Sequence, residues 1–270
     1  MTILDHEFTD LQTPSGAMRT HLFRPAAAGK YPGITLFSEI FQVTGPIRRI
    51  AAMLAGNGFV VAVPEIFHEF EPSDTVIGYD SAGADRGNWC KVNKPLSAYD
   101  EDQRVLREFL KSYEHCSGKL GSMGVCIGGH LNFRNCFSPD ILAGVSFYPT
   151  DIHKLESHVR GLGLGMADDS LERARRGDIQ GELMMIWGRQ DPHVPFEARQ
   201  QMRESLEQGG ACYQGFEFNG AHAFLRDEGP RYNPVLAQQC YALALELFKR
   251  KLGDGDLSAG AGAGAGEARH

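Results

Sequence analysis

The sequence lacks the features of three large classes of protein. No stretch comes near the roughly 18 apolar residues that span a bilayer. No run of Lys or Arg offers a basic face to phosphates, and the net charge of −7 argues against nucleic acid as the main partner. The N-terminus has no basic region followed by an apolar core, so we expect no signal peptide. These absences predict a soluble, acidic, cytoplasmic protein that binds neither nucleic acid nor membrane.

The chain also lacks any CxxC pair. Its six cysteines are scattered, at positions 90, 116, 126, 136, 212 and 240. In a chain of 270 residues, such cysteines are typical of reduced thiols that pack as small apolar side chains. This pattern indicates a reducing compartment, in which one thiol could serve as a nucleophile.

The composition is that of an ordinary globular protein, with 42% hydrophobic and 23% charged residues. Residues 253–270 are rich in Gly and Ala, cannot bury a core, and are predicted to form a flexible tail. We expect residues 1–252 to form a single domain, because α/β folds of roughly 200–250 residues often do.

The apolar pattern alternates between strands and helices after a β-rich start at 7–24, whose Pro-Ser-Gly turn predicts a hairpin. Continuous apolar runs predict strands buried on both faces at 33–37 and 59–63, and further strands are expected near 119–125, 141–147, 182–187 and 212–218. Helical spacing predicts helices at 46–57 and 98–113, and further helices are expected near 128–136, 169–177, 195–208 and 233–251. This order predicts an α/β fold with a mainly parallel central sheet and helices on both faces. Residues 65–97 are polar, and we expect an irregular, lid-like excursion over the sheet.

The sharpest chemical signal is a Gly-x-Cys-x-Gly-Gly motif centred on Cys126, between a predicted strand and a predicted helix. A nucleophile on such a tight turn needs small neighbours two residues away on either side. The N-terminus of the helix that follows favours a thiolate or a developing oxyanion. The alternative is a structural cysteine in a glycine-rich turn.

Two loops at later strand ends complete a possible triad. Asp191 lies in a Gly-x-x-Asp-x-x-x-Pro loop, and His222 follows the strand predicted at 212–218. Taken alone, Asp191 could merely cap a helix and His222 could be a solvated loop residue. Together with Cys126 they follow the order nucleophile, acid, histidine of α/β-hydrolases, at the strand ends where active sites of such sheets gather. His130 and His193 are other histidines near these motifs; we expect His130 to pack or face solvent, and leave open whether His193 lines the pocket.

Over roughly residues 10–250, these motifs resemble the dienelactone hydrolase (carboxymethylenebutenolidase) family. The resemblance implies an α/β-hydrolase fold and a cysteine hydrolase of lactone or ester bonds that works through an acyl-thioester. It places Glu39 beside the resting Cys126 and gives it a role in keeping the thiol protonated until substrate arrives. By the same analogy, the backbone N–H groups of Ile127 and Ile40 form the oxyanion hole.

The namesake substrate carries a carboxylate, for which a guanidinium offers two-pronged binding. The resemblance implies this role for Arg226, four residues after His222, and Arg86 is the nearest candidate for a second arginine. Either could instead be a solvated arginine. We expect a small lactone or ester, with a carboxylate, as the partner, and a monomer or small homo-oligomer.

Two departures from the family outline put the substrate in doubt. Residues 65–97 are longer than a compact member needs, and Gln42 stands where the family commonly has glycine. A metal site from His68, Glu69 and Glu71 is conceivable, but such charged loop residues are usually solvated, so we expect no metal and no cofactor.

Two rival functions remain open at this point. Glutamine amidotransferases also place a cysteine on a Gly-x-Cys-x-Gly turn, but usually draw their histidine from another position and lack the later Asp loop. A hydrolase scaffold that has lost catalysis could instead serve as a thiol sensor or binding module, although the presence of all three triad residues favours an enzyme.

Overall fold

A single eight-stranded sheet forms the centre of the computed structural model, which describes residues 1–153, 164 and 168–253. The strands lie in the order β1-β2-β4-β3-β5-β6-β7-β8. They are β1 (Ile3–Thr13), β2 (Gly16–Pro25), β3 (Tyr31–Phe37), β4 (Val60–Pro64), β5 (Cys116–Val125), β6 (Ile141–Phe147), β7 (Glu182–Gly188) and β8 (Tyr213–Phe218). The hairpin β1–β2 joins β4 antiparallel, and every pair from β4 through β3 to β8 is parallel. The sheet is therefore mainly parallel, as predicted.

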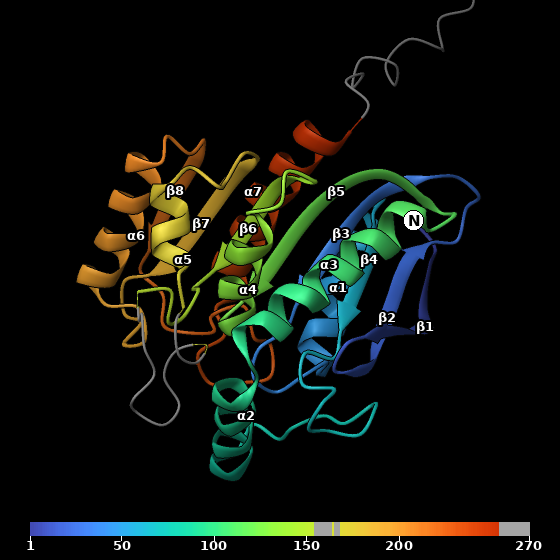
Figure 1. The fold of residues 1–270 in the computed structure, drawn as a ribbon, viewed down its shortest axis with the longest axis horizontal. Helices are drawn as coiled ribbons and strands as arrows, with labels where there is room; N and C mark the ends of the chain where they lie inside the picture. The colour runs from blue at the N-terminus through green and yellow to red at the C-terminus, as the bar shows by residue number, and fades with distance from the viewer. Residues whose placement is uncertain (154–163, 165–167, 254–270) are drawn as a thin grey trace, which may run out of the picture.

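Helices cover both faces of this sheet (Figure 1). They are α1 (Gly45–Gly56), α2 (Ser81–Asn93), α3 (Leu96–Ser112), α4 (Ile127–Asn135), α5 (Ser170–Arg175), α6 (Phe196–Gln208) and α7 (Pro234–Leu252). Side chains from α3, α4, α5 and α6 form one buried cluster, and those from α1 and α7 form the other. Strand β7 serves both, because Met185 and Trp187 enter the first cluster while Met184 and Ile186 enter the second. Its continuous apolar run is explained by burial on both sides.

The expectation of an irregular segment over 65–97 is wrong where α2 forms. This helix has no apolar stripe, which is why its sequence does not suggest a helix. Its N-cap Asp80 accepts a hydrogen bond from the Gly83 backbone N–H at 2.7 Å. Gly83 and Gly87 let the helix pack closely, because a Cβ at Gly83 would lie 1.9 Å from the Gly78 carbonyl oxygen. In Figure 1, α2 stands below the sheet, beyond its strand ends.

The predicted C-terminal tail at 253–270 lies outside the described residues, apart from Gly253. No helix in the described part of the chain is long and apolar enough to cross a membrane.

Candidate active site

Cys126 occupies a strained turn between β5 and α4. Its φ of 59° lies in the left-handed region that residues with a Cβ rarely adopt. The flanking glycines make the turn possible: a Cβ at Gly124 would lie 1.8 Å from the Gly128 carbonyl oxygen, and one at Gly128 would lie 2.2 Å from that of Phe37. The turn holds the thiol at the start of α4, and the side chain stays partly exposed.

His222 contacts this thiol from the end of β8, and Asp191 contacts His222 from the end of β7. The His222 Nε2 lies 3.3 Å from Sγ of Cys126, and its Nδ1 lies 2.7 Å from Oδ2 of Asp191. The other carboxylate oxygen of Asp191 accepts a hydrogen bond from the His193 backbone N–H at 2.8 Å. Asp191 does not cap α6, whose N-cap is Pro195 and has no side-chain cap bond. The structure thus brings the three predicted residues together in one line of contacts.

The charge state of this line is set by its neighbours. Burial by itself lowers the pKa of His222, but the charge of Cys126 and the hydrogen bond to Asp191 outweigh burial and raise that pKa well above its usual value. Such a shift favours a protonated imidazole between Cys126 and the Asp191 carboxylate.

Glu39 is paired with Arg226 in this structure. The guanidinium Nε and Nη2 donate to the Glu39 Oε2 and Oε1 at 2.9 and 2.8 Å, across 187 residues of sequence. Arg226 also lies over the rings of Phe41 and Tyr79, at 5.0 and 4.4 Å. The resemblance places Glu39 beside Cys126; here no hydrogen bond joins the two among the described residues. Burial raises the pKa of Tyr148, and the negative charges of Glu39 and Cys126 raise this pKa further. Both groups therefore lie close enough to Tyr148 to affect it electrostatically.

Among the described residues, the backbone N–H groups of Ile40 and Ile127 have no hydrogen-bond acceptor. Ile127 is the first residue of α4, so its N–H has no intrahelical partner. Among the hydrogen bonds of the described residues, neither this N–H nor that of Ile40 donates to another group. Ile40 is also in close contact with α2, because a Cβ at Gly87 would lie 2.3 Å from the Ile40 carbonyl oxygen.

A cavity of about 320 Å³ opens above the thiol. Its lining combines residues from the strand ends with residues from α2 and the segment before α7: Ile40, Phe41, Tyr79, Ala84, Asn88, Lys91, Cys126, Thr150, Asp151, His193, His222, Arg226 and Arg231. Sequence reasoning missed Lys91, Asp151 and Arg231. A helix assignment for 81–93 would have revealed the spacing of Ala84, Asn88 and Lys91, which share one helix face.

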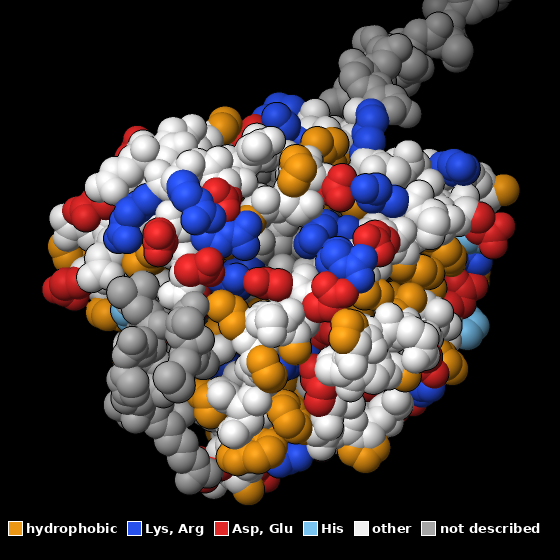
Figure 2. Space-filling view, viewed as in Figure 1, with side chains coloured by type: hydrophobic (Ala, Val, Ile, Leu, Met, Phe, Trp, Pro, Cys, Tyr) orange, Lys and Arg blue, Asp and Glu red, His pale blue; other side chains and the backbone are white. Residues whose placement is uncertain are grey.

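Arg86 does not line this cavity. Its Nε donates to Glu71 at 2.5 Å, and its guanidinium lies 4.7 Å from the Trp89 ring. Figure 2 shows hydrophobic side chains at the surface over α2, where Trp89 is 39% exposed. These contacts place Arg86 outside the cavity, so it is not a candidate for binding the substrate.

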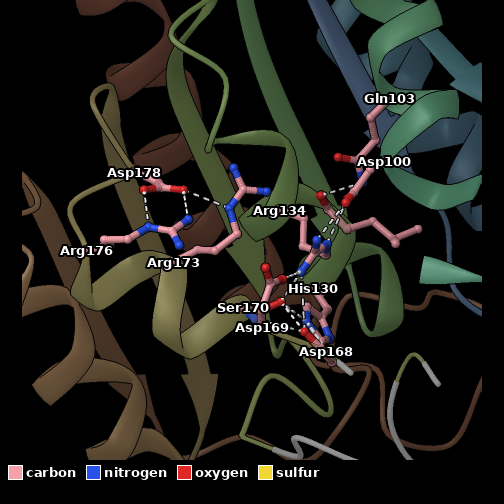
Figure 3. A network of polar contacts seen from close by, with 11 residues as sticks. Asp100, Gln103, His130, Arg134, Asp168, Asp169, Ser170, Arg173, Arg176 and Asp178 are labelled. Atoms are coloured by element: carbon pink, nitrogen blue, oxygen red, sulfur yellow. Dashed lines mark hydrogen bonds and ion pairs between the residues drawn. The ribbon is translucent and has the colours of Figure 1, made fainter. Parts of the chain in front are cut away.

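The two other histidines have distinct surroundings. His193 lines the cavity, and its ring lies 4.7 Å from that of His222. His130 is fully buried on α4, as packing predicts, with Nε2 at 2.8 Å from the Ser170 hydroxyl and 3.2 Å from Asp168. Figure 3 shows this cluster with Arg134 beside it. Burial alone would raise the pKa of Asp168, but His130 and Ser170 outweigh burial and lower it to about 2.

The residues weighed as metal ligands lie in a different arrangement. His68 and Glu69 gather with Asp102, whereas Glu71 pairs with Arg86. The ammonium of Lys94 already sits in this group, 2.8 Å from Glu69 and 2.5 Å from Asp102. A fixed cation among these carboxylates opposes a metal ion there.

Comparisons with known proteins bear on the family and the fold. A family model described as "Dienelactone hydrolase family" matches residues 18–252. A Saccharomyces cerevisiae protein named "Putative carboxymethylenebutenolidase" is 39% identical over 261 residues, 93% of each chain. A Pseudomonas protein named "Carboxymethylenebutenolidase" is 27% identical over 241 residues, 87% of this chain and 91% of that one. Among solved structures, a "Putative Dienelactone Hydrolase" from Klebsiella pneumoniae matches with a TM-score of 0.78 at 20% identity, over 93% of this chain and 100% of that one. The predicted α/β-hydrolase fold is thereby confirmed.

Proposed function

The chain belongs to the dienelactone hydrolase family, and from this premise we propose that it cleaves small lactones or esters with Cys126 as the nucleophile. Membership makes the protein a hydrolase of ester or lactone bonds. One observation supports the finer assignment: His222 lies 3.3 Å from the thiol and 2.7 Å from Asp191 at the base of a 320 Å³ cavity. This places a nucleophile, a base and its orienting carboxylate within reach of a small carbonyl compound.

In the proposed first half-reaction, the thiolate attacks the carbonyl carbon and the carbonyl electron pair moves to oxygen. The N–H groups of Ile127 and Ile40 donate to this oxyanion, and losing one such donor commonly costs about 2.7–4 kcal/mol of barrier. The intermediate then collapses, the ring C–O bond breaks, and the His222 imidazolium gives its proton to the leaving oxygen. The product is an acyl-thioester on Cys126 with a neutral imidazole beside it.

In the second half-reaction, neutral His222 takes a proton from water, and the resulting hydroxide attacks the thioester carbonyl. Collapse breaks the C–S bond, releases the acid, and returns the thiolate and imidazolium pair. Asp191 keeps the imidazole in the orientation that points Nε2 at sulfur and stabilises its positive form. Each step uses only groups that line the cavity or contact its lining.

Arg226 and Glu39 are proposed to connect substrate binding with the state of the thiol. Arg226 lines the cavity, so a substrate carboxylate can compete with Glu39 for its guanidinium. A displaced Glu39 carboxylate would then be free to act on Cys126, which is the route that the family resemblance implies.

The test is the ultraviolet absorbance of a dienelactone incubated with wild-type protein and with Cys126→Ala. We expect turnover by wild type only. Cys212→Ala is the matched control, because Cys212 is an exposed thiol outside the cavity and its removal should leave turnover intact. Inactive wild type would exclude the namesake substrate, and a panel of simple esters would follow.

Two outcomes would redirect the assignment. Inertness toward every ester, with Cys126 still alkylated, would favour the thiol sensor. Turnover by Cys126→Ala would exclude the thioester mechanism. We retain a reducing, cytoplasmic setting as part of the proposal, supported by six free cysteines, and leave the assembly as a monomer or small homo-oligomer.

A further inference from the structure

A second polar cavity lies between α3, α4 and α5, on the face of the sheet that is turned toward the viewer in Figure 1. Its volume is about 210 Å³, and no described residue lines both this cavity and the one above Cys126. The lining residues are Asp100, Gln103, Arg107, Arg134, Phe137, Ser138 and Arg173. Figure 2 shows Lys and Arg side chains gathered with Asp and Glu on this face. Three guanidinium groups and one carboxylate therefore meet in a small space, which suits an anion.

Two of these arginines are held in place by acidic side chains. The Arg134 side chain is 1% exposed, and its Nε and Nη2 donate to the Asp100 carboxylate at 2.8 and 2.7 Å. The Arg173 Nε donates to Asp178 at 2.7 Å, and its guanidinium carbon lies 4.3 Å from the centre of the Phe137 ring. Figure 3 shows both acid–arginine pairs. These contacts fix the two guanidinium groups in position, and the carboxylates offset much of their charge.

Arg107, on α3, differs from both because it lacks a carboxylate partner. Within the described residues it forms no ion pair, and its one hydrogen bond runs from Nη1 to Oδ1 of Asn135. A guanidinium has five N–H donors, so most of those on Arg107 can donate to a ligand in the cavity. Burial lowers the pKa of Arg107, because the charges of Asp140 and Asp100 offset the desolvation only in part. A bound anion would stabilise this partly desolvated cation.

We propose that this cavity binds a phosphate group, held by Arg107 together with Arg134 and Arg173. The three guanidinium groups come from three different helices, so they approach a ligand from different directions. The oxygens of a tetrahedral phosphate can accept from all three, whereas a carboxylate presents two oxygens in one plane. The Ser138 hydroxyl donates to no group among the described residues, so it offers one further hydrogen bond.

The ligand class is inorganic phosphate or a small phosphate monoester. The site goes beyond the proposed function, because α4 separates it from the nucleophile. Cys126 precedes the first residue of this helix, and Arg134 lies near its last, roughly 10 Å along the axis at about 1.5 Å per residue.

The test is a calorimetric titration of the full chain with inorganic phosphate at constant ionic strength. We expect saturable binding by wild type, and binding at least about 10-fold weaker in Arg107→Gln, because charge-assisted hydrogen bonds are lost. Arg104→Gln is the matched control, because it removes an exposed arginine of the same helix that pairs with Glu101 and Glu108 outside the cavity. It should bind phosphate like wild type. The proposal is overturned if wild type shows no saturable binding, if Arg107→Gln binds equally well, or if the control loses as much.

A further variant separates this site from the cavity above Cys126. Arg231→Gln removes an arginine that lines that other cavity, and phosphate affinity should not change. A loss as large as that in Arg107→Gln would place the phosphate above Cys126 and overturn the proposal. If a thermal melt shows that Arg107→Gln does not fold, Arg173→Gln takes its place, and wild-type affinity in that variant is the contrary result. None of these measurements uses turnover, so the inference fails or stands independently of the proposed function.

Two more ligands define the chemical class. Methyl phosphate that binds more tightly than inorganic phosphate would assign the site to a phosphate monoester, and the reverse order would assign it to free phosphate. Malonate carries two planar carboxylates, and we expect it to bind more weakly than either. Malonate affinity equal to that of phosphate would overturn the assignment to a phosphate group.

Discussion

Gly87→Ala tests whether α2 holds the Ile40 loop in its working position. An added Cβ would lie 2.3 Å from the Ile40 carbonyl oxygen and 2.9 Å from the Ile40 Cβ, whereas ordinary contact begins at 3.4 Å. Either the loop or the helix must therefore move by roughly 1 Å, a displacement that can reduce a catalysed rate about 10²-fold. That factor corresponds to about 2.7 kcal/mol of lost transition-state stabilisation.

The kinetic constants distinguish which element moves. If the Ile40 loop yields, its proposed oxyanion donor is misplaced, and kcat should fall about 10²-fold. If α2 yields, Asn88 and Lys91 shift in the cavity lining, and KM should rise instead. The assay is steady-state hydrolysis of the best substrate, with a thermal melt, because overpacking also costs about 1–3 kcal/mol of stability.

The matched control for this variant is Gly56→Ala at the end of α1. A Cβ at Gly56 meets nothing within 4 Å, so activity should persist. A folded Gly87→Ala protein with both constants within about twofold of wild type would refute the reasoning. It would show that the contact of α2 with Ile40 has no part in catalysis or binding.

Three further predictions follow from the buried charges. Asp191→Asn should lower kcat by roughly 10³–10⁴-fold at a similar melting temperature, because the imidazole loses its counter-charge but keeps a polar neighbour; a normal kcat would remove Asp191 from the mechanism. Because Cys126 and Asp191 raise the pKa of His222, this imidazole should assist the reaction of the Cys126 thiol, and His222→Ala should slow its alkylation by iodoacetamide at about pH 6; an unchanged rate would contradict this role of His222. The folded-state pKa of Asp168 is lowered to about 2, below its unfolded value, so its contribution of roughly 2 kcal/mol is present above about pH 4 and is lost as pH falls toward 2. Urea unfolding should show Asp168→Asn to be less stable at pH 7, with a gap that closes in acid; a constant gap would contradict this.

Much of the fold follows from local pattern alone. The strand predicted at 182–187 is Glu182–Gly188, and the helix predicted at 233–251 is Pro234–Leu252. These elements are buried by the sheet arrangement itself, so their sequences carry the periodicity that burial demands. The same reasoning places Cys126, Asp191 and His222 together, since parallel strands bring their carboxyl ends to one edge.

The partners of the cavity charges could not be predicted in this way. Arg226 meets Glu39 across 187 residues, and Lys91 meets Asp151 across 60. The spacing of apolar residues along the chain contains no information about such long-range pairs. From the sequence alone, each of these residues is expected to be a solvated charge.

The proposed chemistry and one wall of the cavity are carried by different elements of the fold. The nucleophile, acid and histidine follow β5, β7 and β8, and their geometry depends on the parallel sheet. Ala84, Asn88 and Lys91 line the cavity from α2. This helix lies outside the sheet and contacts Ile40 through Gly87. Changes on the outer turns of α2 can therefore alter the cavity wall without disturbing the sheet. The glycines of this helix allow close backbone packing, so we expect a larger residue at Gly87 to alter the site even though it touches no substrate.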